Sequence, residues 1–102
     1  MTDKELLELA AKAANYELAS TKDGYPLWRN GVGVWNPLTD DGDALRLAVK
    51  LGLSIDPNTL GITVGNFRTL YKLACYESCG NDPYAATRRA IVRAAAEIGK
   101  TS

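Results

Sequence analysis

Three stretches of the chain carry apolar residues at the three- and four-residue spacing of amphipathic helices. The first begins with a capping box, in which the side chains of Thr2 and Glu5 satisfy each other's exposed backbone N–H groups. Apolar positions continue to Leu18, and turn residues follow at Lys22–Gly24. The pattern predicts a helix that starts at Thr2 and ends at this turn.

The second helix is predicted to begin at a cap supplied by Thr39 or Asp40 and to end at Gly52, which is well placed as a C-cap. Asp40, Asp41 and Asp43 put negative charge into its first turn, where the helix dipole favours it. The same carboxylates could hold a magnesium or calcium ion, although the spacing is not that of an EF-hand loop. We interpret them as a charged helix start and predict no metal site.

The third helix is predicted to open at Asp82-Pro83, with aspartate as N-cap and proline at the first helical position, and to end at Gly99. Tyr84, Arg88 and Arg89 lie near one another at helical spacing. They could form an anion or nucleotide site, because arginine offers a bidentate fork and tyrosine a stacking face. The alternative is that the arginines pair with surface carboxylates.

The segment between the first two helices predicts a β-hairpin. Asn30-Gly31 suits a tight type I′ turn between Tyr25–Arg29 and Val32–Trp35. Trp28 and Trp35 would then lie opposite or diagonal to each other. They either pack into the core or form an exposed aromatic patch that anchors a partner.

A second hairpin is predicted before the third helix, after a turn-rich connection at Ser54–Asn58. Leu60–Val64 reads as a strand, and Gly65-Asn66 as the turn that follows it. Thr69–Glu77 fits a strand or a short helix by periodicity, and we favour a strand because it could pair with Leu60–Val64.

The element order is therefore helix, hairpin, helix, hairpin, helix within one domain covering residues 1–102. Three alanine-rich amphipathic helices need a surface on which to bury their apolar stripes. We predict an α+β fold, a three-layer α/β/α sandwich in which helices cover both faces of an antiparallel or mixed sheet.

Composition narrows the class of partner. Twelve basic and twelve acidic residues cancel, which disfavours nucleic acid as a partner.

The sequence has no apolar run long enough to span a membrane and no basic leader, so we expect a cytosolic protein. Cys75 and Cys79 are expected to be thiols in that compartment, and without histidine they make a poor zinc site.

The sequence lacks the usual signatures of an enzyme. It contains no histidine, which removes the commonest general acid–base group and the usual partner of a serine or cysteine nucleophile. It also contains neither a P-loop nor a dinucleotide-binding fingerprint. We therefore predict no catalytic residues and no cofactor.

Two strings, WNPLTDDGDALRLAVKLG at Trp35–Gly52 and NDPYAATRRAIVRAAAEIGK at Asn81–Lys100, resemble the small tailed-phage proteins called phage ABA-sandwich domain proteins. The resemblance implies a helix–sheet–helix sandwich and a phage or prophage gene product in a bacterial host cytoplasm. It supplies no catalytic residues.

These observations lead to the hypothesis of a non-enzymatic phage accessory protein that binds a host protein and inhibits or redirects a host or defence factor. The predicted partner-binding residues are Trp28, Trp35, Tyr84, Arg88 and Arg89. The alternative is a homo-oligomeric sponge that sequesters a nucleotide-type signal with Arg88 and Arg89. A membrane partner is not expected.

Overall fold

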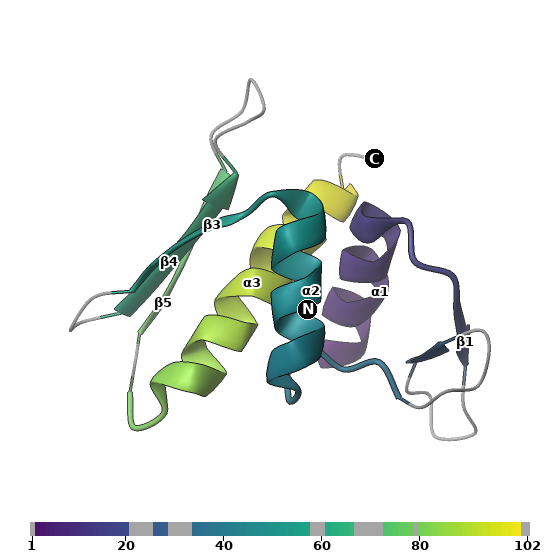
Figure 1. The fold of residues 1–102 in the computed structure, drawn as a ribbon, viewed down its shortest axis with the longest axis horizontal. Coiled ribbons are helices and arrows are strands. Elements are labelled where there is room, and N and C mark those ends of the chain that lie inside the picture. The colour runs from purple at the N-terminus through teal and green to yellow at the C-terminus, as the bar shows by residue number, and fades with distance from the viewer. Residues whose placement is uncertain are drawn as a thin grey trace.

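The computed structural model describes residues 2–20, 26–28, 34–57, 61–66, 73–78 and 80–100. Its helices and strands are labelled in Figure 1 in chain order. They are α1 (Asp3–Ala14), β1 (Leu18–Ser20), β2 (Pro26–Trp28), α2 (Asp41–Leu51), β3 (Ser54–Pro57), β4 (Gly61–Asn66), β5 (Leu73–Ser78) and α3 (Pro83–Lys100).

The predicted helix starts are confirmed by their caps. The Thr2 hydroxyl accepts a hydrogen bond from the Glu5 N–H at 3.2 Å, and an Asp40 carboxylate oxygen accepts one from the Asp43 N–H at 2.7 Å. At the third helix, Asp82 accepts from the N–H groups of Tyr84 and Ala85. Each cap uses a short polar side chain to satisfy N–H groups that have no partner within the helix.

The predicted end of the first helix is wrong. The helix stops at Ala14, because Asn15 adopts the left-handed conformation with φ of 60° and donates its backbone N–H to carbonyl groups of the last turn. Asparagine tolerates this conformation better than most residues and can end a helix as glycine does. Leu18 therefore belongs to β1, and Lys22–Gly24 lies outside the described residues.

The core is built between helices. α3 lies at its centre, with α1 and α2 packed against it (Figure 1). Alanine predominates in the contact, which lets helix backbones approach closely. Among the described side chains, the buried apolar ones are Leu6, Leu7, Ala10, Ala11, Ala14, Trp35, Ala44, Leu47, Ala48, Ala86, Ala90, Ile91, Val92, Ala94, Ala95 and Ala96.

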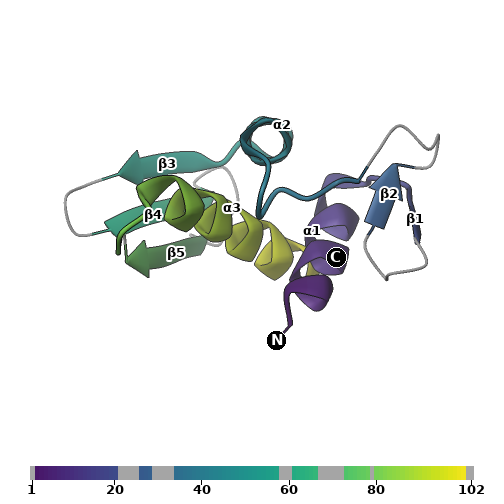
Figure 2. The ribbon, with the colours of Figure 1, turned by 90° about the horizontal axis from the view of Figure 1, so that it is seen from below.

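The predicted three-layer α/β/α sandwich is wrong. The described strands form two separate antiparallel sheets, one of β1 and β2 and one in the order β3-β4-β5. The helices lie between these sheets, instead of enclosing one sheet (Figures 1 and 2). The alanine stripes that were expected to cover a sheet are buried mainly against other helices, and it is α3 that packs across β4 and β5.

Strand pairing also differs from the prediction. β2 pairs with β1, and Trp28 lies opposite Leu18. The Asn30-Gly31 turn lies outside the described residues, and Val34 forms an isolated β bridge. The partner strand β1 precedes β2 in the chain and was not predicted as a strand.

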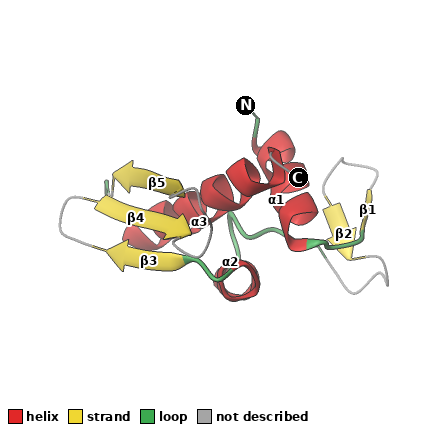
Figure 3. Ribbon diagram, turned by 90° about the horizontal axis from the view of Figure 1, so that it is seen from above, coloured by secondary structure: helices red, strands yellow, loops and turns green. Residues whose placement is uncertain are grey.

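The second sheet contains one strand that was not predicted. Ser54–Pro57, interpreted as a turn-rich connection, is the edge strand β3 (Figure 3). Gly65 and Asn66 continue β4 and do not form a turn. Leu73–Ser78 is a strand, which confirms the choice of strand over helix for the described part of Thr69–Glu77.

Candidate functional site

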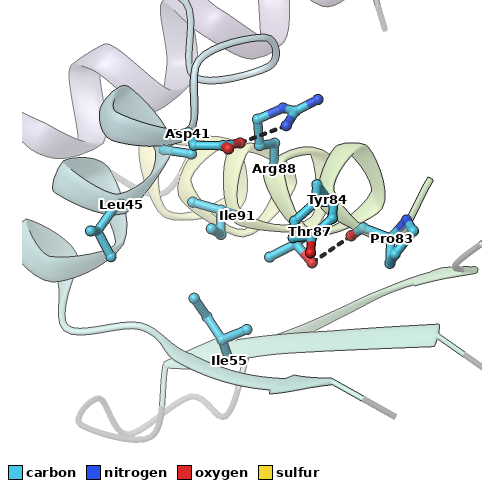
Figure 4. Close-up of a pocket in the computed structure, with 9 residues that line it drawn as sticks. Asp41, Leu45, Ile55, Pro83, Tyr84, Thr87, Arg88 and Ile91 are labelled. Carbon is cyan, nitrogen blue, oxygen red and sulfur yellow. Dashed lines mark hydrogen bonds and ion pairs between the residues drawn. The ribbon is translucent and has the colours of Figure 1, made fainter. Parts of the chain in front are cut away.

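A hollow of about 470 Å³ opens between α2, β3 and the first turns of α3 (Figure 4). A second hollow, of about 390 Å³, lies between α2 and the chain that leads into β3, and it shares Leu45 and Ile55 with the first. We call the two together the α2–α3 groove. Its lining residues are Asp41, Ala44, Leu45, Ala48, Val49, Gly52, Leu53, Ser54, Ile55, Pro83, Tyr84, Thr87, Arg88 and Ile91.

The groove exposes large apolar side chains. Leu45 is 61% exposed, Val49 72% and Tyr84 72%, and Ile55 faces the same hollow from β3 (Figure 4). Ile91 is buried and closes the groove from α3. Apolar side chains gathered around a hollow make this groove a candidate binding surface.

The groove has a simple origin in the sequence of α2. Ala44, Leu47 and Ala48 form the buried stripe that the amphipathic pattern predicts. Leu45 and Val49 are four residues apart, so they lie one above the other on a different face of the helix. The sequence interpretation missed this second face. Its signal was a pair of large apolar residues outside the predicted stripe.

Arg88 is held by its own chain. Its Nε donates to the Leu38 carbonyl oxygen at 2.9 Å, and its Nη1 pairs with Asp41 Oδ1 at 2.5 Å. Only 17% of the Arg88 side chain is exposed, whereas 75% of the Asp41 side chain is. This ion pair joins α3 to the start of α2, and the Asp41 carboxylate faces solvent.

Arg89 is directed away from Arg88. Its Nη1 lies 3.3 Å from Asp3 Oδ1 on α1, and its Nε lies 3.6 Å from Glu77 Oε1 on β5. Arg93 pairs with the same Glu77 carboxylate. The structure therefore does not bring Arg88 and Arg89 together as one anion site, and each guanidinium already has a carboxylate partner.

Trp35 lies in the core and is 1% exposed. Its ring makes an edge-to-face contact with Tyr16, with centroids 5.6 Å apart and planes at 78°. The ammonium group of Lys50 lies 4.9 Å from the centroid of the Tyr16 ring. Burial raises the pKa of the Tyr16 hydroxyl. Trp35 therefore packs into the core and is not part of an exposed aromatic patch.

Trp28 lies in β2, and its side chain is outside the described part of the structure. The same holds for the side chain of Cys75 in β5 and for Cys79. Of the five predicted binding residues, Tyr84 and Arg88 line the α2–α3 groove.

The three aspartates at the start of α2 are all engaged by groups of the chain itself. Asp40 caps the helix and Asp41 pairs with Arg88. Asp43 is buried and accepts hydrogen bonds from the Asn36 N–H at 3.0 Å and from Arg46 Nη2 at 2.8 Å. Within the described part of the chain, no group of three or more histidine, cysteine, aspartate or glutamate residues could hold a metal ion.

Replacement of Asp43 by alanine is expected to lower the free energy of unfolding by about 1–3 kcal/mol, because the Asn36 N–H loses its acceptor in a partly buried position. Asp43→Asn keeps an acceptor oxygen and should lower it less. Urea denaturation followed by circular dichroism measures both values. Unfolding of Asp43→Ala at the wild-type midpoint would show that this contact does not hold the loop to α2.

No helix in the described residues is long and apolar enough to cross a bilayer. When the chain is compared with protein-family models, with curated proteins and with solved structures, nothing matches. The resemblance of Trp35–Gly52 and Asn81–Lys100 to phage ABA-sandwich proteins therefore stays a prediction. These two segments contain α2 and α3, the two helices that form the groove.

Proposed function

We propose that this chain is a non-enzymatic phage accessory protein that binds a host protein through the α2–α3 groove. The observation that carries the proposal is the exposure of Leu45, Val49 and Tyr84 around the two adjoining hollows of this groove. The phage origin and the bacterial cytoplasm rest on the resemblance of the two helical segments. Binding would inhibit or redirect a host enzyme or defence factor.

The energetics of burial favour a protein partner. Covering a large apolar side chain contributes about 1.5–3 kcal/mol, and the groove offers several such side chains within one connected surface. Aromatic residues at the centre of an interface are frequent hot spots. Tyr84 has this character, because its ring is largely exposed beside the first turn of α3.

The polar groups of the groove favour a binding function over a catalytic one. Arg88 and Asp41 neutralise each other, and the Thr87 hydroxyl donates to the Pro83 carbonyl oxygen at 2.7 Å. A catalytic site needs acids, bases or nucleophiles aimed at a reacting atom, whereas these groups are aimed at their own chain. The alternative of a nucleotide sponge is weakened by the same contacts, since a phosphate would have to displace carboxylates from Arg88 and Arg89.

Leu45→Glu is expected to reduce partner capture at least about 30-fold, as loss of a hot spot of 2 kcal/mol or more would. Glutamate has nearly the helix propensity of leucine, so α2 should stay folded. Val34→Glu is the matched control, because Val34 is 52% exposed and does not line the groove.

The measurement is affinity capture from a lysate of the bacterial host, with the captured proteins quantified by mass spectrometry. We expect a partner that is retained by the wild type and by Val34→Glu and is lost with Leu45→Glu. Equal capture by all three folded proteins would refute the groove as the binding surface.

A further inference from the structure

We infer that Arg88 is a positioning residue of the α2–α3 groove, which fixes the start of α2 on α3 without contacting the partner. The inference rests on the proposed function and adds how the binding surface keeps its shape. Arg88 lines the groove, yet only 17% of its side chain is exposed. Its guanidinium is directed at the chain around the start of α2 (Figure 4).

This one guanidinium makes two contacts with the segment that begins α2. Nε donates to the Leu38 carbonyl oxygen just before the helix, and Nη1 donates to Asp41 Oδ1 in the first turn. Arginine holds its N–H groups in a rigid planar fork, so two acceptors fix both the distance and the direction of the approach. The ammonium group of a lysine carries the same charge but lacks this fork.

The segment that receives these contacts is internally bonded. Asn36 Oδ1 accepts from the Leu38 N–H at 3.0 Å, and the Asn36 carbonyl oxygen accepts from the Asp40 N–H at 2.9 Å. The Asp43 carboxylate accepts from the Asn36 N–H at 3.0 Å. These bonds tie residues 36–43 to the first turn of α2, so a contact at the Leu38 carbonyl also constrains the helix.

The apolar contact of α2 defines its position only weakly. Two of its three buried apolar residues are alanines, Ala44 and Ala48, and its large Leu45 and Val49 side chains are exposed. Short side chains interlock less than long ones, so an alanine-rich face can turn or slide on its neighbour. Arg88 adds polar contacts of fixed geometry at one end of α2, and the shape of the groove therefore depends on it.

Amide hydrogen exchange of the full chain, followed by NMR, compares Arg88→Lys with the wild type. We expect exchange of the Ala48 amide in α2 to rise about tenfold or more relative to that of the Ala10 amide in α1. The loss of a hydrogen bond made by a charged group has an effect of this order, and it would fall on the local opening of α2. A residue that contributed only to overall stability would change both amides equally.

Arg93→Lys is the matched control. It makes the same change on the same helix, but at a guanidinium that pairs with Glu77 on β5. It should leave the ratio of the α2 and α1 exchange rates at the wild-type value. A ratio that Arg88→Lys leaves unchanged, or that Arg93→Lys raises as much, would overturn the inference.

A second measurement separates positioning from contact with the partner. The probe is a peptide taken from a random display library, whose binding to the full chain Leu45→Glu abolishes. We expect Arg88→Lys and Asp41→Ala each to weaken this peptide about threefold to tenfold, and the double variant to bind no more weakly than Arg88→Lys alone, because both changes break one bridge. If Arg88 contacted the peptide, removal of the Asp41 carboxylate would free the guanidinium, and unchanged or tighter binding would overturn the inference.

The outcomes separate this inference from the proposed function. If peptides depend on Leu45 and Arg88→Lys changes neither the exchange ratio nor their affinity, the docking site stands and the positioning role is overturned. An exchange ratio that rises without loss of peptide affinity also overturns it, because the groove would then not depend on Arg88. If no peptide depends on Leu45, both the docking site and the inference are overturned.

Discussion

Trp35→Ala is expected to lower the free energy of unfolding by about 3–5 kcal/mol, the largest effect of any single substitution considered. The ring is buried at 1% exposure and packs edge-to-face against Tyr16. Truncation removes the burial of the ring and leaves a cavity that the surrounding helices can fill only in part. For a domain with a total stability of about 5–15 kcal/mol, this loss is a large fraction.

Urea denaturation of the purified variants measures the effect. Tyr84→Ala is the matched control, because it truncates an aromatic residue that is 72% exposed, and it should change stability by no more than about 0.5 kcal/mol. The two variants should separate folding from binding: Trp35→Ala loses stability and Tyr84→Ala loses partner capture. A Trp35→Ala protein with wild-type stability and no partner capture would show instead that Trp35 is the anchor.

Gly99→Ala is expected to destabilise the protein by about 1–3 kcal/mol or more, because the added methyl group collides with α1. A Cβ at position 99 would lie 2.8 Å from the Leu9 carbonyl carbon and closer still to its oxygen. Both atoms belong to the backbone, so the contact can be relieved only if α1 moves relative to α3. These helices form the main contact of the core.

Gly42→Ala is the control for helix propensity. Gly42 also lies inside a helix, but a Cβ there meets only side-chain atoms of Arg46 and Asp40, at 3.2 Å or more, and no backbone atom within that distance. Alanine favours the helix over glycine by about 1 kcal/mol, so this variant should be neutral or more stable than the wild type. Thermal unfolding compares the two. If Gly99→Ala melts at or above the wild-type temperature, α1 and α3 do not cross at Gly99.

The helices could be predicted because their signals are local. Capping residues such as Thr2, Asp40 and Asp82 act within three residues of the N–H groups they satisfy. Asn15 also acts locally, because its left-handed conformation ends α1. The turn residues at Lys22–Gly24 indicated a later end of this helix. Helix ends thus depend on single residues that the apolar periodicity does not mark.

The arrangement of the layers could not be predicted, because it depends on contacts between distant segments. An alanine-rich stripe fits a sheet or another helix, and its periodicity does not distinguish the two. The partner of β2 is Leu18–Ser20, a segment whose pattern also fitted the first helix. Whether a stripe is covered by a sheet or by a helix is set by tertiary packing that no local pattern contains.

The candidate site was predicted only in part for a similar reason. Tyr84 and Arg88 were recognised by residue type, and both line the groove. The exposure of Leu45 and Val49 depends on how α2 is turned against α3, which the stripe of Ala44, Leu47 and Ala48 indicates only indirectly.

Photo-crosslinking in the bacterial host tests the docking surface most directly. A photoreactive phenylalanine analogue is placed at position 84, inside the groove, or at position 34, which is exposed outside it. We predict a covalent adduct with one host protein from position 84 and none from position 34, and the adduct should disappear when Leu45→Glu is added. An adduct formed only from position 34, or one from position 84 that persists with Leu45→Glu, would contradict binding through the α2–α3 groove.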